Sequence, residues 1–358
     1  MISVPAPRTR TPVRLTRQTK ALRKALYDFM TGKLITEMAG GDLDFIGDVH
    51  GEIDSLRALL DTLGYSLDGN HPKGRRLVFV GDLVDRGPDS VGVVDLISNL
   101  VSVGRAQCVL GNHELNLLRQ ERKPNNEWFF DRINASSRSA IVSFFKPLPL
   151  ALERRGLRTV HACWHQPAVD CVRRHAGDAL SLYRLFDRKS QQTLALEGVT
   201  QAADQQQRAW VLTDSTQTPP MLDAVAQFQA RKQMDNPVAI MTSGIETVAA
   251  EPFWAKGKWR FTARVPWWED YAQQDDVVIG HYWRSRTGGH QFTRGPGLFD
   301  NASTLGGLGP QERVMCIDYS IGQRAKERRL NPKGPFKSAL AAFRITDQKP
   351  SEVIFSPV

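Results

Sequence analysis

Acidic and imidazole side chains follow several apolar runs of this sequence, each at the point where the run ends. The segment "GDLVDRGPDS" at 81–90 comes directly after Leu77–Val80 and brings three carboxylates and an arginine. Such oxygen and nitrogen donors on rigid strand ends suit borderline divalent ions such as Mn²⁺, Fe²⁺ or Zn²⁺, whereas Mg²⁺ and Ca²⁺ prefer oxygen ligands alone. The candidate metal ligands are Asp48, His50, Asp82, Asn112, His161 and His281.

This donor set is large enough for two ions. Two metals about 3.5–4 Å apart, bridged by a carboxylate, can clamp the attacking and leaving oxygens of a phosphoryl transfer. Taken singly the signals are weak, because "GDVHG" could be a hydrogen-bonded loop and "GNHE" could simply cap the helix that follows. Their ordered combination, each after an apolar run, favours the metal site.

The elements that must position these donors alternate between short apolar runs and helical stretches. From residue 43, "LDFIG" leads into "EIDSLRALLDTLG", and two further units of the same kind follow up to residue 118. Repeated strand–turn–helix units predict an α/β layered core, and ligand sites in such folds lie outside the carboxyl ends of the strands. Short strands at 158–162 and 276–281 each end at or near a histidine.

Between these later strands the alternating pattern weakens. Residues 166–270 include the glutamine-rich "DQQQRAW" and the tryptophan-rich "FWAKGKWRFTARVPWWEDY", which predict a helical or irregular insertion forming a lid or rim. Its tryptophans could stack a nucleobase, but a role in the core of the insertion is favoured. The predicted organisation is a basic N-terminal extension with a short helix at 1–40 and one domain at 41–350 that includes this insertion.

The charge of the chain is concentrated at its N-terminus. The 358 residues carry a formal charge of +9, and seven basic residues lie between Arg8 and Lys24, before the first acid, Asp28. The rest is nearly balanced, so attraction to an acidic partner belongs mainly to this arm. No apolar run could cross a bilayer, and four cysteines without a CxxC pair favour a reducing cytoplasm.

The ordered series "GDVHG", "GDLVDRG", "GNHE", His161 and His281 resembles the calcineurin-like metallophosphoesterases, in particular the phosphoprotein phosphatase branch and its bacterial members. The match covers residues 43–118 and resumes at 157–162, 276–282 and 314–320. The resemblance implies a layered sandwich of central β-sheets flanked by helices. It also implies hydrolysis of phosphate esters by metal-activated hydroxide.

The same resemblance implies how the ligands are shared. Asp48, His50 and Asp82 would hold one ion, and Asp82, Asn112, His161 and His281 the other. Asp82 would bridge the two, which requires a carboxylate with two usable oxygens. Mn²⁺ is the first choice, with Fe or Zn as alternatives.

Three more residues receive catalytic roles. Arg86 can present its planar fork to phosphoryl oxygens. The resemblance makes His113 the general acid that protonates the leaving oxygen, and Asp85 the carboxylate that orients its imidazole. Arg260 and Arg264 are candidates for a second phosphate-binding arginine.

Three functions remain open from the sequence. The leading one is a phosphoserine or phosphothreonine phosphatase, supported by the complete "GDLVDRG" and "GNHE" motifs. The second is a hydrolase of dinucleoside polyphosphates or other nucleotides. Departures from the family pattern at "HACWH" and at Asp318-Tyr319-Ser320 leave substrate choice open between them. The third is an inactive binding module that engages an acidic partner through its basic arm. Deleting residues 1–24 and measuring polyanion binding would test this role of the arm.

Overall fold

Two five-stranded sheets form the centre of the fold in the computed structural model, which describes residues 33–286, 297–300, 302–346 and 351–357. One sheet has the strand order β12-β11-β2-β3-β4, and we call it the β3 sheet; the other has the order β1-β5-β6-β9-β10, and we call it the β9 sheet. The strands of the β3 sheet are β2 (Leu43–Ile46), β3 (Arg76–Phe79), β4 (Ala106–Cys108), β11 (Ala341–Ile345) and β12 (Glu352–Phe355). Those of the β9 sheet are β1 (Ile35–Glu37), β5 (Ala151–Arg154), β6 (Leu157–Val160), β9 (Asp276–Ile279) and β10 (Val314–Cys316).

The side chains of β2 and β3 alternate between two apolar layers. Phe45 and Val78 belong to a cluster that also holds Leu152 and Val278 of the β9 sheet, so this cluster fills the space between the sheets. Phe79 points the other way, into the main core. A strand buried on both faces reads as a nearly continuous apolar run, which is the pattern seen in the sequence.

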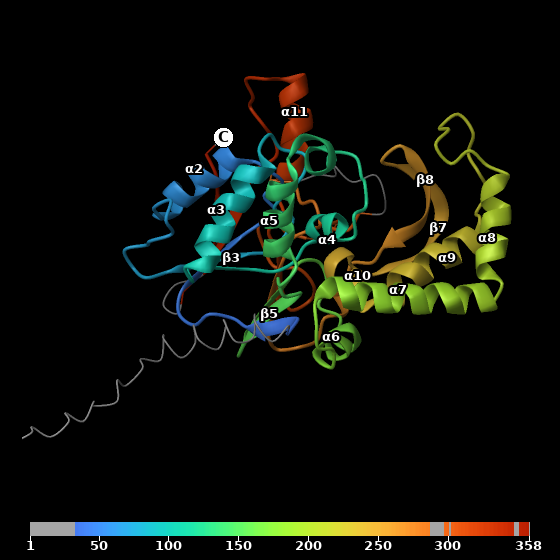
Figure 1. Cartoon of the computed structure of the whole chain (residues 1–358), viewed down its shortest axis with the longest axis horizontal. Coiled ribbons are helices and arrows are strands. Elements are labelled where there is room, and N and C mark those ends of the chain that lie inside the picture. The colour runs from blue at the N-terminus through green and yellow to red at the C-terminus, as the bar shows by residue number, and fades with distance from the viewer. Residues whose placement is uncertain (1–32, 287–296, 301, 347–350, 358) are drawn as a thin grey trace, which may run out of the picture.

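Helices cover the outer faces of these layers, as the fold-class prediction requires. In α2, Leu56, Leu59 and Leu63 lie on one face at helical spacing and are fully or almost fully buried. Figure 1 shows α2 and α3 beside β3. The helices of this part are α2 (Ile53–Leu63), α3 (Ser90–Ser102), α4 (Asn112–Leu118), α5 (Ala135–Phe145) and α11 (Arg324–Leu330). Short π and 3₁₀ segments are η1 (Trp128–Arg132), η2 (Trp267–Asp270) and η3 (Ile321–Gln323). The α/β sandwich with central sheets is confirmed.

The predicted insertion contains more regular structure than its sequence indicated. Its helices are α6 (Gln166–Arg173), α7 (Ala179–Leu196), α8 (Val199–Arg208), α9 (Asp223–Met234) and α10 (Pro237–Ser243). They are followed by a long hairpin of β7 (Glu246–Ala255) and β8 (Lys258–Arg264), so the expectation of a helical or irregular segment was incomplete. Figure 1 places α7, α8, α9 and the hairpin together at the end of the molecule away from α2. A small core centred on Phe261 and Val225 joins the hairpin to α9.

The tryptophans of the insertion lie in two different places. Trp267 and Trp268 are buried in the main core, whereas the sequence favoured a core of the insertion itself. Trp254 and Trp259 are half-buried and pack edge to face across the hairpin, with ring centroids 5.6 Å apart.

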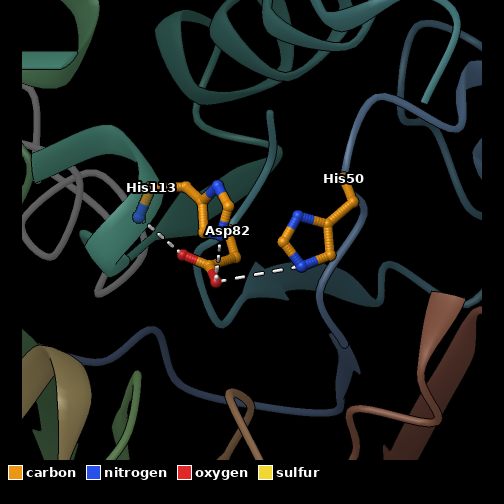
Figure 2. A group of neighbouring side chains, drawn as sticks. All are labelled: His50, Asp82 and His113. Carbon is orange, nitrogen blue, oxygen red and sulfur yellow. Dashed lines mark hydrogen bonds and ion pairs between the residues drawn. The ribbon is translucent and has the colours of Figure 1, made fainter. Parts of the chain in front are cut away.

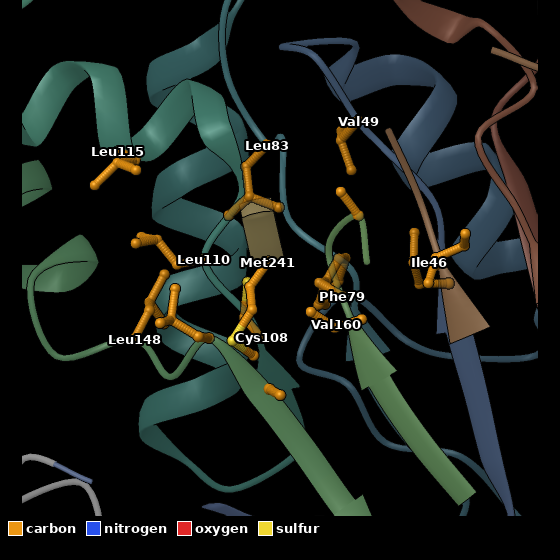
Figure 3. Packing of buried hydrophobic residues seen from close by; sticks show 14 of the residues in the cluster. Ile46, Val49, Phe79, Leu83, Cys108, Leu110, Leu115, Leu148, Val160 and Met241 are labelled. Atoms are coloured by element: carbon orange, nitrogen blue, oxygen red, sulfur yellow. The ribbon is translucent and has the colours of Figure 1, made fainter. Parts of the chain in front are cut away.

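Helix α10 anchors the insertion to the site-bearing part of the fold. Met241 is fully buried and packs in the same cluster as Cys108 and Leu110, as Figure 3 shows. Its carbonyl accepts a hydrogen bond of 2.9 Å from the backbone N–H of Ala162. The chain segment that follows His161 is therefore fixed by the insertion.

The N-terminal boundary of the domain differs from the prediction. Strand β1 pairs in parallel with β5, with Ile35 opposite Ala151, so the β9 sheet begins inside the stretch 1–40 that was assigned to an extension. The three-residue strand was missed because it is too short to show a pattern. The predicted basic arm and its helix lie outside the described residues. No helix among the described residues is long and apolar enough to span a membrane.

Candidate metal centre

The predicted metal ligands meet where the two sheets meet. Strands β2, β3 and β4 are parallel, and so are β6 and β9, so the carboxyl ends of each group lie together. The first group delivers Asp48, His50, Asp82 and Asn112, and the second delivers His161 and His281. All six side chains predicted as ligands are thus brought into one place, although they come from two sheets.

Asp82 lies at the centre of this arrangement. Its Oδ2 is 3.9 Å from His50 Nε2, and its Oδ1 is 3.3 Å from His161 Nε2. Figure 2 shows the rings of His50 and His113 on two sides of this carboxylate. The potential ligand atoms form two groups that share Asp82, one with His50 and His113 and the other with His161 and His281.

The remaining two predicted ligands lie at the edges of these groups. Asn112 Oδ1 is 2.8 Å from His281 Nδ1 and 3.3 Å from His161 Nε2, beside the second group. Asp48 Oδ2 is 3.9 Å from His50 Nε2, beside the first group. His113, which was predicted as an acid rather than a ligand, also lies within reach of the first group, with Nε2 3.9 Å from Asp82 Oδ2.

Backbone carbonyls orient two of the imidazoles. His50 Nδ1 donates to the Val84 carbonyl at 3.0 Å, and His161 Nδ1 donates to the Val80 carbonyl at 2.7 Å. Each bond leaves Nε2 as the nitrogen that faces the centre, which is how metal-binding histidines are commonly held. Nε2 of His50 is buried and has no hydrogen-bond partner in the described part of the chain. A buried ring nitrogen without a partner is satisfied by a metal ion, so the residues fit one.

The electrostatics also suit cation binding. Burial alone would raise the pKa of Asp82, but the charges of His161 and His113 hold it well below its usual range, so this carboxyl is ionised. Burial, followed by the positive charge of Arg86, depresses the pKa of His50, and burial followed by Arg264 depresses that of His281. Ionised Asp82 and neutral His50 and His281 are in the forms that bind metals. At His161, burial alone would lower the pKa, but Asp82 outweighs burial and raises it, so this imidazole loses a proton when a metal binds.

Backbone strain is concentrated in the same loops. The φ angles are 48° at His50, 51° at Asp82, 73° at Asp85, 74° at Arg86 and 68° at His281. Residues other than glycine seldom adopt this left-handed region, and each instance costs about 1–3 kcal/mol. The fold therefore accepts strain where these side chains are aimed at the centre.

Glu114 holds the Asp82 turn in place, a role that the sequence reasoning did not assign. It is fully buried, and its oxygens accept bonds from the backbone N–H groups of Asp82 at 2.9 Å, Leu83 at 2.8 Å and Gly111 at 3.0 Å. A side chain at Gly111 would lie 2.4 Å from Asp82 Oδ1, so glycine is required there. The "GNHE" motif thus supports the neighbouring "GD" turn as well as its own helix.

The three predicted catalytic residues are in mutual contact. His113 Nδ1 lies 2.6 Å from Asp85 Oδ2, and Arg86 Nη2 donates to His113 Nε2 at 3.2 Å. Trp128, which was not predicted, donates from Nε1 to the other oxygen of Asp85 at 2.7 Å. Arg86 Nη1 is buried and has no hydrogen-bond partner among the described residues.

Asp318 also lies at the candidate site, although the sequence analysis named it only as a departure from the family motif. It is buried, and one of its oxygens accepts from Ser320 N–H at 2.8 Å while the other has no described partner. Burial and then the charge of Asp318 raise the pKa of Asp48 well above its usual range, so the two carboxyls are close. Asp318 follows β10, just as the predicted ligands follow their strands. This position could have identified it from the sequence.

Of the two candidate arginines, only one lies near the centre. The charge of Arg264 acts on His281, and its Cζ is 5.6 Å from the ring centroid of Tyr282. Arg260 instead donates from Nε to the Ala255 carbonyl within the hairpin, at 3.3 Å.

Comparison with known proteins agrees with this geometry. Residues 42–216 match the family model for calcineurin-like phosphoesterases. The chain is 51% identical over 79 residues to an asymmetrical bis(5'-nucleosyl)-tetraphosphatase of Halalkalibacterium halodurans, covering 21% of this chain and 32% of the relative. It is 36% identical over 121 residues to a symmetrical bis(5'-nucleosyl)-tetraphosphatase of Ralstonia nicotianae, covering 33% and 40% of the two chains.

The matched part therefore spans well under half of either relative's length. Among solved structures, a protein serine/threonine phosphatase from Saccharomyces cerevisiae is similar with a TM-score of 0.48 and 11% identity, covering 96% of this chain and 90% of that chain. The family match spans the strands that precede Asp48, Asp82, Asn112 and His161. Residues 42–216 therefore match the calcineurin-like phosphoesterase family, in agreement with the fold and the geometry of the site.

Proposed function

We propose that this chain is a dinuclear-metal hydrolase of phosphorylated nucleotides, with dinucleoside polyphosphates as the substrate class. The observation that carries the proposal is the position of Asp82, shared by two groups of potential ligand atoms. One ion would be held by Asp48, His50 and Asp82, and the other by Asp82, Asn112, His161 and His281. Bound divalent ions, with Mn²⁺ as the first choice, would polarise the phosphoryl group and activate water.

The chain's own residues supply the remaining parts of the reaction. Water adds to phosphorus, and the bond from phosphorus to the leaving oxygen breaks. Arg86, whose Nη1 has no described partner, binds a phosphoryl oxygen as charge develops there. This frees His113 Nε2 from its contact with Arg86, so that Nε2 can carry a proton and pass it to the leaving oxygen while Asp85 holds Nδ1–H.

The substrate class is supported by the relatives and differs from the leading reading of the sequence. Both curated relatives reported above are named as bis(5'-nucleosyl)-tetraphosphatases. A phosphoserine or phosphothreonine phosphatase, favoured from the motifs alone, is represented among the proteins reported above by a structure of only 11% identity. We therefore place the nucleotide substrate first and the phosphopeptide second.

The test is a comparison of two substrates on metal-stripped, full-length protein to which Mn²⁺ is added back. Diadenosine tetraphosphate is expected to be hydrolysed with a kcat/KM at least about tenfold above that of a phosphoserine peptide. Asp82→Asn, purified in parallel, reveals any contaminating phosphatase because it should be inactive on both. A preference for the peptide would reverse the order of the two substrates, and failure of the metal-loaded protein on both would refute the function.

A further inference from the structure

The tip of the β7–β8 hairpin carries a lysine in an unfavourable backbone conformation. Ala255 pairs with Lys258, which leaves Lys256 and Gly257 as a two-residue turn, and their φ angles are 50° and 74°. Positive φ at both central positions is the geometry of a type I′ turn, for which asparagine, aspartate and glycine are the favoured residues at the first position. Lysine gains nothing locally from this position, which points to a role beyond the turn.

The hairpin tip reaches the catalytic residues. Lys256 Nζ lies 5.0 Å from the centroid of the Trp283 ring, and Arg86 Cζ lies 4.9 Å from the same ring. Arg86 in turn contacts His113, and Trp283 follows His281 by two residues. The insertion thus brings one ammonium group to the same indole ring that the Arg86 guanidinium contacts.

Positive charge gathers around Lys256, and the nearby carboxylate of Asp82 offsets it only in part. In the described parts of the chain no carboxylate forms an ion pair with Lys256, Arg86 or Arg264. Although Lys256 as a residue is exposed, lost hydration of its ammonium group, followed by the charges of Arg264, Arg86 and Arg260, lowers its pKa to about 7. Cations that repel one another beside a reaction centre are stabilised by a bound anion.

We infer that Lys256, together with Arg86, binds a phosphate group of the substrate beyond the one that is attacked. The inference rests on the proposed function and narrows it to substrates with a chain of phosphates. A monoester places one phosphoryl group at the metal ligands and leaves Lys256 without an anion. A polyphosphate chain extends from the metal ligands past Arg86, and its next phosphate meets the hairpin tip.

The variant that tests this is Lys256→Asn, because asparagine tolerates positive φ and keeps the turn while removing the charge. Lys256→Arg keeps the charge. Lys258→Gln is the matched control, since it removes a second exposed lysine from the same hairpin without altering the turn positions. The substrates are diadenosine tetraphosphate, with four phosphates in a chain, and p-nitrophenyl phosphate, with one.

In the Mn²⁺-loaded full-length protein, Lys256→Asn is expected to lower the ratio of the two kcat/KM values, tetraphosphate over monoester, by about tenfold, mainly through KM. Lys256→Arg should restore most of the ratio, and Lys258→Gln should keep it within about twofold. An unchanged ratio in Lys256→Asn would overturn the inference while leaving the proposed function intact.

A binding measurement separates failure of the inference from failure of the function. Calorimetry on metal-free protein with inorganic tripolyphosphate and with orthophosphate reports the anion site without any catalysis. Lys256→Asn should weaken tripolyphosphate binding about tenfold and affect orthophosphate much less. Equal weakening of both anions, or of neither, would refute a second phosphate site even if the protein hydrolyses no nucleotide.

Discussion

His113 is bound to Asp85 through a short contact of 2.6 Å between Nδ1 and Oδ2, and the other oxygen of Asp85 is bound to Trp128. The carboxylate is therefore fixed by a rigid indole on one side and fixes the imidazole on the other. Because a carboxylate accepts only, the proton on that side of His113 stays on Nδ1, and Nε2 is the nitrogen that faces the centre.

Replacing His113 by asparagine should lower kcat about 10²- to 10⁴-fold, since the leaving oxygen loses its proton donor. Both metals should stay bound, which elemental analysis of the purified variant can measure. His113 lies within reach of one ligand group, so loss of one metal ion in this variant would make it a ligand rather than the acid.

Replacing Trp128 by phenylalanine should lower kcat about fivefold with little change in KM, because it removes one hydrogen bond to Asp85. Trp254→Phe, in the half-buried hairpin pair, is the control and should leave kcat unchanged.

Replacing Asp82 by asparagine should reduce the bound metal from two ions to less than one, because both ligand groups share that carboxylate. Asn112→Ala should remove only the ion on the side of His161 and His281. Equal metal content in the two variants would argue against Asp82 as a bridge.

Removing metal with a chelator should abolish hydrolysis and lower the thermal midpoint. The Nε2 atoms of His50 and His281 are buried and have no described hydrogen-bond partner, so a bound ion would supply the missing interaction. Mn²⁺ at about 100 times its Kd should add about 2.7 kcal/mol to stability. Differential scanning fluorimetry with and without Mn²⁺ measures this, and His281→Ala should show a smaller rise.

Asp44, which is not one of the predicted metal ligands, should make the stability of the fold depend on pH. Burial would raise its pKa, but hydrogen bonds from Arg75, Arg344 and Tyr65 outweigh burial and hold it below its usual range. A depressed folded pKa stabilises the fold above the unfolded value of about 3.9, and this stabilisation is lost as pH falls through the folded value. Asp44→Asn should cost about 3 kcal/mol at pH 7.

The difference between wild type and Asp44→Asn should shrink between pH 5 and pH 3, as measured by urea unfolding at each pH. Asp54→Asn, an exposed acid on α2, serves as the control and should show no such trend. A difference that stayed constant with pH would show that Asp44 acts through packing rather than charge.

The residues predicted as ligands lie together in the structure, and the sequence indicated this because each follows a strand whose burial leaves a long apolar run. Glycine before Asp48 and Asp82 marked the turns, and the parallel strand order then brought the side chains together. The grouping of His161 and His281 with them depended on a second sheet, whose short strands gave only weak patterns.

Other parts could not be read from local patterns. Trp128 contacts Asp85 from a π-helical turn, which no apolar periodicity in the sequence predicts. Lys256 lies on a hairpin whose strand β7 alternates poorly because both of its faces are partly exposed. Asp318 could have been found by extending the strand-end rule to β10, whereas the missing family motif "Asp-Thr-Gly" directed attention away from it.

Strands β6 and β9 are hydrogen-bonded neighbours, with Leu157 opposite Asp276, although the whole α6–β8 excursion lies between them in sequence. The excursion is therefore a single crossover connection, and the pairing of β6 with β9 fixes both of its ends. A replacement that leaves and re-enters at the same points must therefore also supply the α10 contacts that fix the segment after His161. The excursion can vary as one contiguous cassette only where this anchor is kept.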